Sequence, residues 1–340
     1  MNFDFVDVFI RAAKITWRYK VLWIFGILAG CARGNSGGGS NSNFNPNTGY
    51  QGNGFSDSPF TPEMIRQMES FAEKAVNWFE HNSWILFVLV AFALLSIIIQ
   101  IIFYFIGTAG LVRGVTQVED GAQSLHFGEL LSESLKYFWR LFGAALILWI
   151  PFYIVFFLIL FGVLTFGIFP VIDDPASAGV GMMGSVILMF ISICCCFFPV
   201  TIVVSLYNQM VNRAIIVENE GVLTALSRGW MVFSKNIGAL LIVAVLLFVI
   251  GLVGGLIISI PIFIPTVLVV QSMLQGGFTS WQPIINLFIF MLCYTPVLWF
   301  LYGILTTYTE SVWTLSYLQF TRPHPSQIVF ADTAPDVQAE

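Results

Sequence analysis

Four charged residues stand at or near the ends of long apolar runs, where a charge needs either solvent or a partner. They are Arg113, Arg213, Glu218 and Glu310. Charged side chains in such places reach out to headgroups or pair with an opposite charge. Acids and a glycine follow the basic residue in two of these places. We therefore expect Arg–Glu pairing at helix ends, with Glu310 as a structural group near the membrane edge.

A second set of residues combines tryptophan with lysine or arginine just before an apolar run. The set comprises Lys14, Trp17, Arg18, Lys136, Trp139, Arg140, Arg228, Trp230 and Lys235. Tryptophan favours the headgroup level of a bilayer, and basic side chains extend to the phosphates. Two interpretations stay open: these residues are membrane anchors, or they form a basic collar that binds lipid headgroups or a protein partner.

Residues for catalysis or metal binding form no recognised arrangement in this chain. It has no nucleophile beside a base, no paired catalytic carboxylates and no phosphate loop. Its five cysteines lie in or beside apolar runs without the second pair that a zinc site needs. We expect no catalytic residues, no metal, no cofactor and no enzymatic activity. The expected partners are membrane lipids, with a protein partner left open and nucleic acid excluded.

The elements that must position these residues are transmembrane helices. The sequence is 57% hydrophobic and 10% charged, whereas soluble proteins carry about 25% charged residues. A helix needs about 20 apolar residues to cross a bilayer, and open strands would leave backbone groups unpaired in lipid. We predict an all-α, polytopic transmembrane helical bundle of about six spans. The predicted spans are residues 19–32, 83–111, 141–166, 180–206, 237–262 and 284–308.

The remaining segments are assigned by composition. Residues 1–322 are predicted to form a single membrane domain, and residues 323–340 a disordered cytoplasmic tail. The Gly-, Ser- and Asn-rich residues 34–59 predict a flexible external loop. Residues 61–82 follow with helical apolar spacing and predict an external amphipathic helix.

The basic residues predict the orientation. With the N-terminus inside, inside segments hold 11 of the 14 lysines and arginines and outside segments hold 3. Because loops rich in lysine and arginine stay in the cytoplasm, we expect both termini there, in the cell inner (plasma) membrane.

An internal repeat organises the spans. Residues 131–147 and 226–242 are identical at seven of 17 aligned positions, and residues 5–18 echo the first of them. Each copy reads as an amphipathic helix, a basic and usually aromatic junction, and then an outward span. The repeat therefore predicts three cytoplasmic amphipathic helices.

The segment ALSRGWMVFSKNIGALLIVAVLLFVI and the closing SVWTLSYLQF resemble a group of bacterial multi-pass proteins. Their membrane region is similar to the one fused to some glycerophosphodiester phosphodiesterases. The resemblance implies a six-helix membrane domain acting in lipid-related or envelope processes. It does not imply phosphodiesterase activity, because that enzyme's barrel with its metal ligands has no counterpart here.

Residues 28–31, Leu-Ala-Gly-Cys, resemble a bacterial lipoprotein cleavage box. Cleavage there would remove the first span and lipidate Cys31. The long N-terminal region, which contains Asp4 and Asp7 and matches the repeat, argues for retention.

Two functions compete. The leading hypothesis is a non-enzymatic membrane scaffold or lipid-interacting protein of the cell envelope. The alternative is a transporter of small molecules or lipids, in which Pro151, Pro261 and Pro265 would mark broken helices. A polar cavity favours transport, and a dry bundle favours the scaffold.

Overall fold

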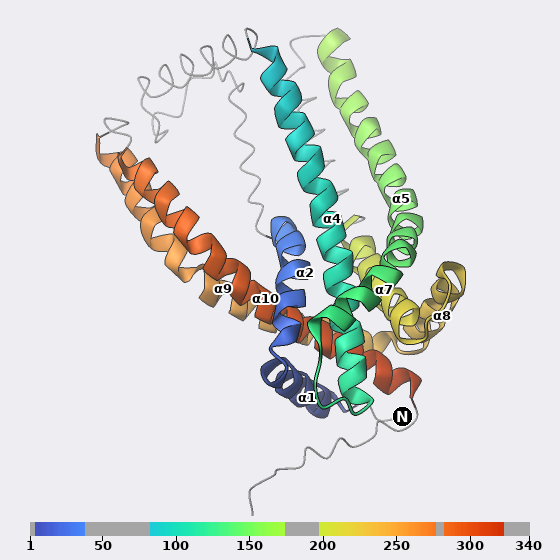
Figure 1. The fold of residues 1–340 in the computed structure, drawn as a ribbon. Coiled ribbons are helices and arrows are strands. Elements are labelled where there is room, and N and C mark those ends of the chain that lie inside the picture. Colours follow the sequence, from blue (N-terminus) through green and yellow to red (C-terminus); the bar gives the residue numbers. More distant parts are fainter. Residues whose placement is uncertain (1–3, 38–81, 174–196, 277–281, 323–340) are drawn as a thin grey trace, which may run out of the picture. The chain divides into compact units, whose positions relative to one another are not determined.

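The computed structural model describes residues 4–37, 82–173, 197–276 and 282–322. The predicted external helix and the predicted tail lie outside these ranges, apart from the boundary residue Asn82. Within them every regular element is a helix, which confirms the all-α class (Figure 1). The helices are α1 (Phe5–Arg18), α2 (Val21–Gly37), α4 (Ser83–Glu119), α5 (Phe127–Asp173), α7 (Phe198–Val217), α8 (Val222–Lys235), α9 (Ile237–Gly276) and α10 (Gln282–Thr321).

Five of these helices are long and apolar enough to cross a membrane. These helices are α4, α5, α7, α9 and α10. The apolar stretch of α2, Val21–Cys31, is shorter than a span requires. Large apolar side chains along the five helices are exposed, as with Phe87 and Phe248 at 74% and 68%. Water would oppose such a surface, so it belongs in lipid, and the chain is a membrane protein.

Three helices continue beyond the predicted ends of their spans. The predicted spans stopped at residues 111, 206 and 308, but the helices run on to Glu119, Val217 and Thr321. In each of these helices the apolar pattern ends at the first polar residues. The helix itself continues through them, because most of those polar residues are buried inside the protein. In the same way α2 continues to Gly37, so the first residues of the predicted loop 34–59 are helical.

The described chain divides into two compact units. Unit 1 takes its residues from 1–22, 108–248 and 307–340, and unit 2 from 23–107 and 249–306. Unit 1 therefore contains α1, α5, α7 and α8 together with one end each of α4, α9 and α10. Unit 2 contains most of α2 and the remaining lengths of α4, α9 and α10.

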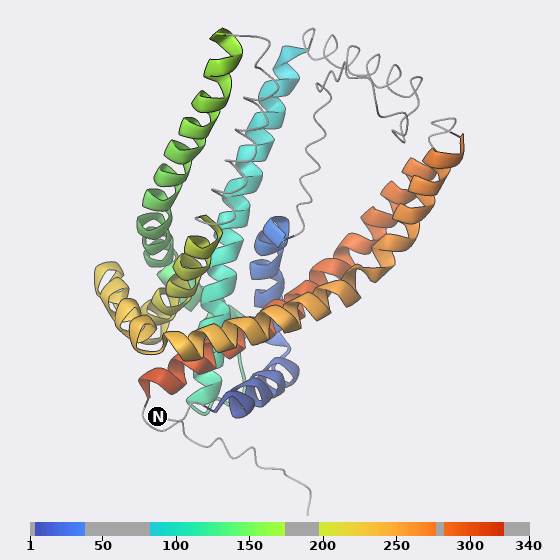
Figure 2. The ribbon, with the colours of Figure 1, turned by 180° about the vertical axis from the view of Figure 1, so that it is seen from behind.

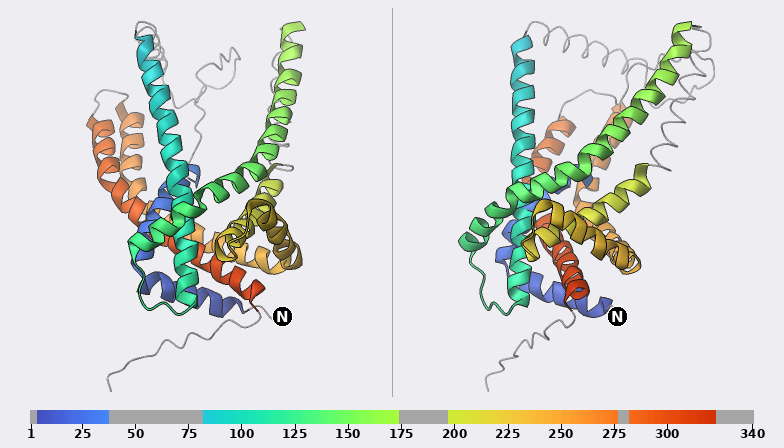
Figure 3. Two further views of the ribbon diagram at one scale, coloured as in Figure 1. Left: turned by 45° about the vertical axis from the view of Figure 1, so that its right-hand side comes forward. Right: turned by 90° about the vertical axis from the view of Figure 1, so that its right-hand side faces the viewer.

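The three amphipathic helices of the repeat are joined to the helices that follow them in different ways. α1 and α2 are separate helices, and Asn236 separates α8 from α9. The Asn236 side chain donates to the Val232 carbonyl at 3.0 Å and so competes with helix continuation. The repeat places Leu141 at the equivalent position of α5, and an apolar side chain cannot compete in this way. As a result α5 is one continuous helix that bends along its length (Figure 3).

Prolines lie within continuous helices. Pro151 lies inside α5, and Pro261 and Pro265 lie inside α9, so none of these prolines marks a broken helix of the kind that the transporter alternative would use. Proline disturbs the backbone hydrogen bonds of the preceding turn. In that turn of α9, the Tyr294 hydroxyl of α10 donates to the Ile258 carbonyl at 2.8 Å. α9 and α10 run side by side in unit 2 (Figure 2).

The short α2 packs with its backbone close to two neighbouring helices of unit 2. A Cβ atom at Gly107 of α4 would lie 2.5 Å from the Ala29 nitrogen and 2.8 Å from the Phe25 carbonyl oxygen. A Cβ atom at Gly303 of α10 would collide with Ile27 in the same manner. Glycine at these two positions therefore lets α2 pack between α4 and α10 despite its length.

This contact predicts the effect of one methyl group. Gly107→Ala should lower the free energy of unfolding by about 1–3 kcal/mol, because the helix backbones must separate. Gly255→Ala in α9 is the matched control, since a Cβ atom there meets nothing within 4 Å. Thermal unfolding of both variants in detergent measures the difference. Equal midpoints would show that α2 does not pack as closely as described.

Candidate functional site

Polar residues fill the second half of α7 and the end of α10 that belongs to unit 1. Asn208, Gln209, Asn212 and Arg213 of α7 are buried. Most hydroxyl side chains of α10 there are buried as well, and several donate to the carbonyl one turn earlier, as Thr314 does to the Glu310 carbonyl at 2.7 Å. Local bonding of this kind satisfies a hydroxyl without a partner helix. The charged side chains, in contrast, need a partner from another helix.

Arg213 and Glu310 form a buried ion pair between these helices. Their side chains are 0% and 2% exposed, and Nη2 of Arg213 lies 2.6 Å from Oε2 of Glu310. Nη1 of Arg213 donates to the Gln209 carbonyl at 2.8 Å and to the Gln209 side-chain oxygen at 2.5 Å. The guanidinium is therefore held by a carboxylate on one side and by its own helix on the other.

Such a pair constrains the fold more than it stabilises it. Removing both charges from water costs several kcal/mol per ion, and their attraction offsets this only with good geometry. Either charge buried alone would be strongly unfavourable. α7 and α10 must therefore stay in the one register that joins Arg213 to Glu310.

Further ion pairs tie each amphipathic helix to the end of an apolar helix. Arg11 of α1 lies 3.3 Å from Glu119 of α4, and Arg113 of α4 lies 2.8 Å from Glu133 of α5. Arg322, just after α10, pairs with exposed Asp120 at 2.8 Å.

Glu218, at the end of α7, joins three helices. It accepts from Arg228 of α8 at 2.9 Å and from the Tyr317 hydroxyl of α10 at 2.8 Å. The hydrogen bond to Glu218 raises the pKa of Arg228 above its ordinary value. Together these pairs hold α1, α5 and α8 against the ends of α4, α7 and α10.

Two helix ends in this region require a left-handed residue. Gly121 follows α4 with φ 98°, and Asn219 follows α7 with φ 54°. The amide nitrogens of Gly121 and Ala122 donate back to Val118 and Gln117, which closes α4 with a Schellman motif. These sharp stops place Glu119 and Glu218 directly against the amphipathic helices.

The expected charge pairs can now be placed. The structure joins Arg213 to Glu310 and Glu218 to Arg228, whereas Arg113 pairs with Glu133, which the sequence had not singled out. Glu310 is paired within the protein, and its side chain is 2% exposed.

The headgroup candidates lie on the surface of unit 1. Trp17, Trp139 and Trp230 are 72%, 74% and 56% exposed. The basic residues beside the first two are exposed as well: Lys14, Arg18, Lys136 and Arg140. On α8, Lys235 is exposed, whereas Arg228 forms an ion pair with Glu218.

Several residues of this core were not singled out from the sequence. They are Arg11, Glu119, Glu133, Asn208, Gln209, Asn212 and Tyr317. One signal was available: Gln209 and Arg213 are one turn apart, as are Asn208 and Asn212, which aligns two polar pairs along α7. The partners from other helices carry no such signal, because spacing within a helix says nothing of what packs against it.

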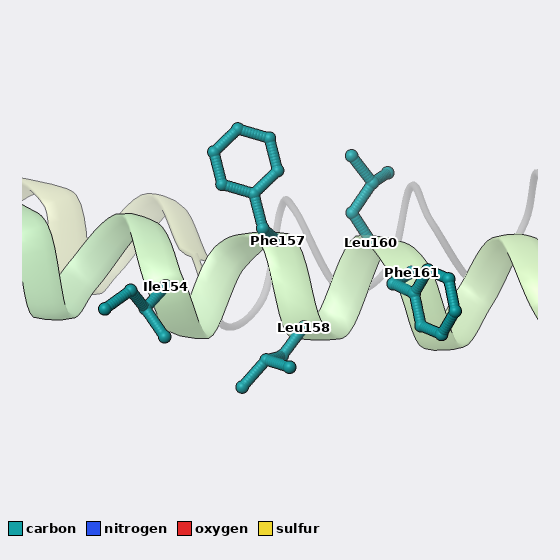
Figure 4. A pocket seen from close by; sticks show the side chains of 5 residues that line it. All are labelled: Ile154, Phe157, Leu158, Leu160 and Phe161. Atoms are coloured by element: carbon teal, nitrogen blue, oxygen red, sulfur yellow. The ribbon is translucent and has the colours of Figure 1, made fainter.

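A cavity beside α5 has a different character. Ile154, Phe157, Leu158, Leu160 and Phe161 line it, all from one helix and all apolar (Figure 4). The part of its lining that the structure describes offers no group to bind a polar substrate. Across the residues that the structure describes, no cluster of three or more His, Cys, Asp or Glu side chains is placed to hold a metal ion.

A family of unknown function (DUF7544) matches residues 16–324. The chain belongs to this family. The match includes α7, α10 and the Arg213–Glu310 pair, so this buried ion pair lies within the family region. No curated protein and no solved structure matches the chain.

The buried pair predicts an asymmetry between single and double substitutions. Glu310→Leu should lower the free energy of unfolding by about 3–5 kcal/mol, because Arg213 would remain buried without its carboxylate. Adding Arg213→Met should recover most of that loss. Denaturant titration in detergent measures both.

The exposed pair provides the control for this experiment. Arg322 and Asp120 are 40% and 52% exposed, so Arg322→Met should change the free energy of unfolding by no more than about 1 kcal/mol. If the double variant at the buried pair were no more stable than Glu310→Leu alone, the two charges would not act as a pair.

The place of Cys31 in α2 bears on lipidation. Cleavage before Cys31 would remove α1 and most of the apolar part of α2, including the fully buried Ile15, Leu22 and Phe25. We therefore expect the intact mass of the purified protein to include residues 1–30. A mass that corresponds to a chain starting at a lipidated Cys31 would contradict this expectation.

Proposed function

We propose that this protein is a non-enzymatic membrane scaffold that interacts with lipids of the cell envelope. In this proposal both termini are cytoplasmic and the unit 1 helices α1 and α8 lie at the inner membrane surface. The resemblance to the membrane region fused to some glycerophosphodiester phosphodiesterases supports the same lipid-related setting.

One observation carries the proposal: the most deeply buried charges are bonded to each other within the protein. Arg213 and Glu310 contact at 2.6 Å, and Gln209 occupies the other side of the guanidinium. Transport sites need charged or polar groups that face a water-filled path. A charge pair locked between two helices serves to hold those helices together, which is what a scaffold requires.

A second candidate, a transporter of small molecules or lipids, is favoured by two amides. Asn208 and Asn212 are 8% and 1% exposed, and their Oδ1 atoms accept no hydrogen bond from any residue in the described ranges. Buried amides of this kind commonly bind water. If that water joined a continuous path through the bilayer, transport would become the better proposal.

Cysteine accessibility separates the two candidates. In a variant whose five native cysteines are replaced by serine or alanine, Asn212→Cys should not react with a membrane-impermeant thiol reagent from either side. The physical reason is that a dry core admits no aqueous reagent. Reaction of Asn212→Cys would establish water access at the buried core and would contradict the scaffold proposal.

Two companion variants make this result interpretable. Ser227→Cys lies exposed on α8 and should react rapidly in inside-out vesicles, in agreement with a cytoplasmic α8. Thr314→Cys, fully buried on α10, repeats the core test at an independent position. Size-exclusion profiles equal to those of the parent chain confirm that each variant is folded.

A further inference from the structure

One short motif occurs twice on the surface of unit 1. Residues 14–18 and residues 136–140 both read Lys-x-x-Trp-Arg, the first near the end of α1 and the second in the initial part of α5. In a helix, side chains three and four positions apart lie on the same side. Each copy therefore presents an ammonium, an indole and a guanidinium group from one helix surface.

Both copies are exposed on helices whose other side is firmly packed. Val8, Ala12 and Ile15 of α1 are fully buried, whereas Trp17 is 72% exposed. In α5, Leu130, Ser134 and Leu141 are buried, whereas Trp139 is 74% exposed. The exposure of the two tryptophans thus follows from which side of the helix packs.

The surfaces around the two tryptophans also contain exposed apolar side chains. Ile10, seven residues before Trp17, is 50% exposed, and Leu135, four residues before Trp139, is 52% exposed. A soluble anionic partner would match the basic groups but would leave these apolar groups in water. A lipid surface matches both, because it offers charged phosphates beside acyl chains.

The second copy has an additional feature that orients its arginine. Nη1 of Arg140 donates to Oδ1 of Asn219 at 2.9 Å. Asn219 is held in the left-handed conformation, with φ 54°, in the turn between α7 and α8. One end of the guanidinium is therefore fixed by the protein while the Arg140 side chain remains exposed.

α8 has a similar composition but a different arrangement. Its arginine, Arg228, contacts the Glu218 carboxylate at 2.9 Å, and Glu218 also accepts from Tyr317. This guanidinium contributes to the packing of α7, α8 and α10. Trp230 therefore lies near an arginine that is paired with Glu218, and Lys235 stands five residues away from Trp230 in the chain.

We propose that the two Lys-x-x-Trp-Arg surfaces, and not α8, each bind the headgroup of an anionic phospholipid. The lysine and arginine contact the phosphate, and the indole and neighbouring apolar side chain contact the glycerol and upper acyl region. This inference deepens the proposed function and depends on it, since it identifies the lipid class with which the scaffold interacts.

Native mass spectrometry of the full chain tests the proposal. The protein is reconstituted in nanodiscs that contain equal parts of phosphatidylglycerol and phosphatidylcholine, and retained lipids are counted after gentle detergent release. The parent chain should retain phosphatidylglycerol in preference to phosphatidylcholine. Lys136→Gln/Arg140→Gln should weaken that preference about tenfold or more at one site, and Lys14→Gln/Arg18→Gln should do so at the other.

Matched variants distinguish this recognition from nonspecific charge. Lys235→Gln removes an exposed basic residue from α8 and should leave the preference unchanged. Lys136→Arg/Arg140→Lys keeps both charges and should retain most of the preference, which also shows that substitution here does not unfold the chain. Equal losses from Lys235→Gln and from the double variants, or no loss from either double variant, would overturn the proposal.

The result is separable from the test of the proposed function. An unreactive Asn212→Cys together with absent lipid preference would leave the scaffold standing and overturn only the headgroup sites. A reactive Asn212→Cys would overturn the scaffold whatever the lipid preference, so the two failures are distinguishable.

Discussion

Arg213 and Glu310 are 97 residues apart in the sequence but 2.6 Å apart in space, and most of unit 1 depends on that contact. Neither charge could remain where it is without the other, because the surroundings exclude water from both side chains. The pair therefore selects among ways of placing α7 beside α10 that apolar packing alone would leave nearly equal. A shift by one turn would bury two isolated charges.

The ion pairs around this core follow a hierarchy of burial. Arg213–Glu310 is fully buried, Arg11–Glu119 is largely so, Arg113–Glu133 and Arg228–Glu218 are partly exposed, and Arg322–Asp120 is open to solvent. Pairs of the buried kind specify geometry, whereas open pairs contribute little free energy. The intermediate pairs join the amphipathic helices to the core beside apolar contacts, such as those of the buried Ile15 of α1 and Phe233 of α8.

Much of this architecture could be predicted from local pattern. The long apolar runs, the scarcity of charge and the repeat led to helices, to amphipathic segments and to tryptophans on the surface. The helix ends could not be predicted from the sequence, because hydropathy decreases at Arg113, Arg213 and Glu310 while backbone hydrogen bonding continues without interruption. The partners could not be predicted either: Glu133 and Gln209 look like ordinary helix residues until a neighbouring helix supplies the matching group. Pattern within one helix cannot contain that information.

The difference between Leu141 and Asn236 has a mechanical consequence. α5 passes from its amphipathic beginning into its apolar length as one continuous, bent helix, whereas Asn236 interrupts the equivalent path from α8 to α9. A thicker or thinner bilayer changes the tilt that an apolar helix adopts. In α5 we expect a change of tilt to move Trp139 and Arg140 together with the apolar length, whereas a break like the one at Asn236 lets the surface helix keep its own angle. The two junctions should therefore respond differently to membrane thickness.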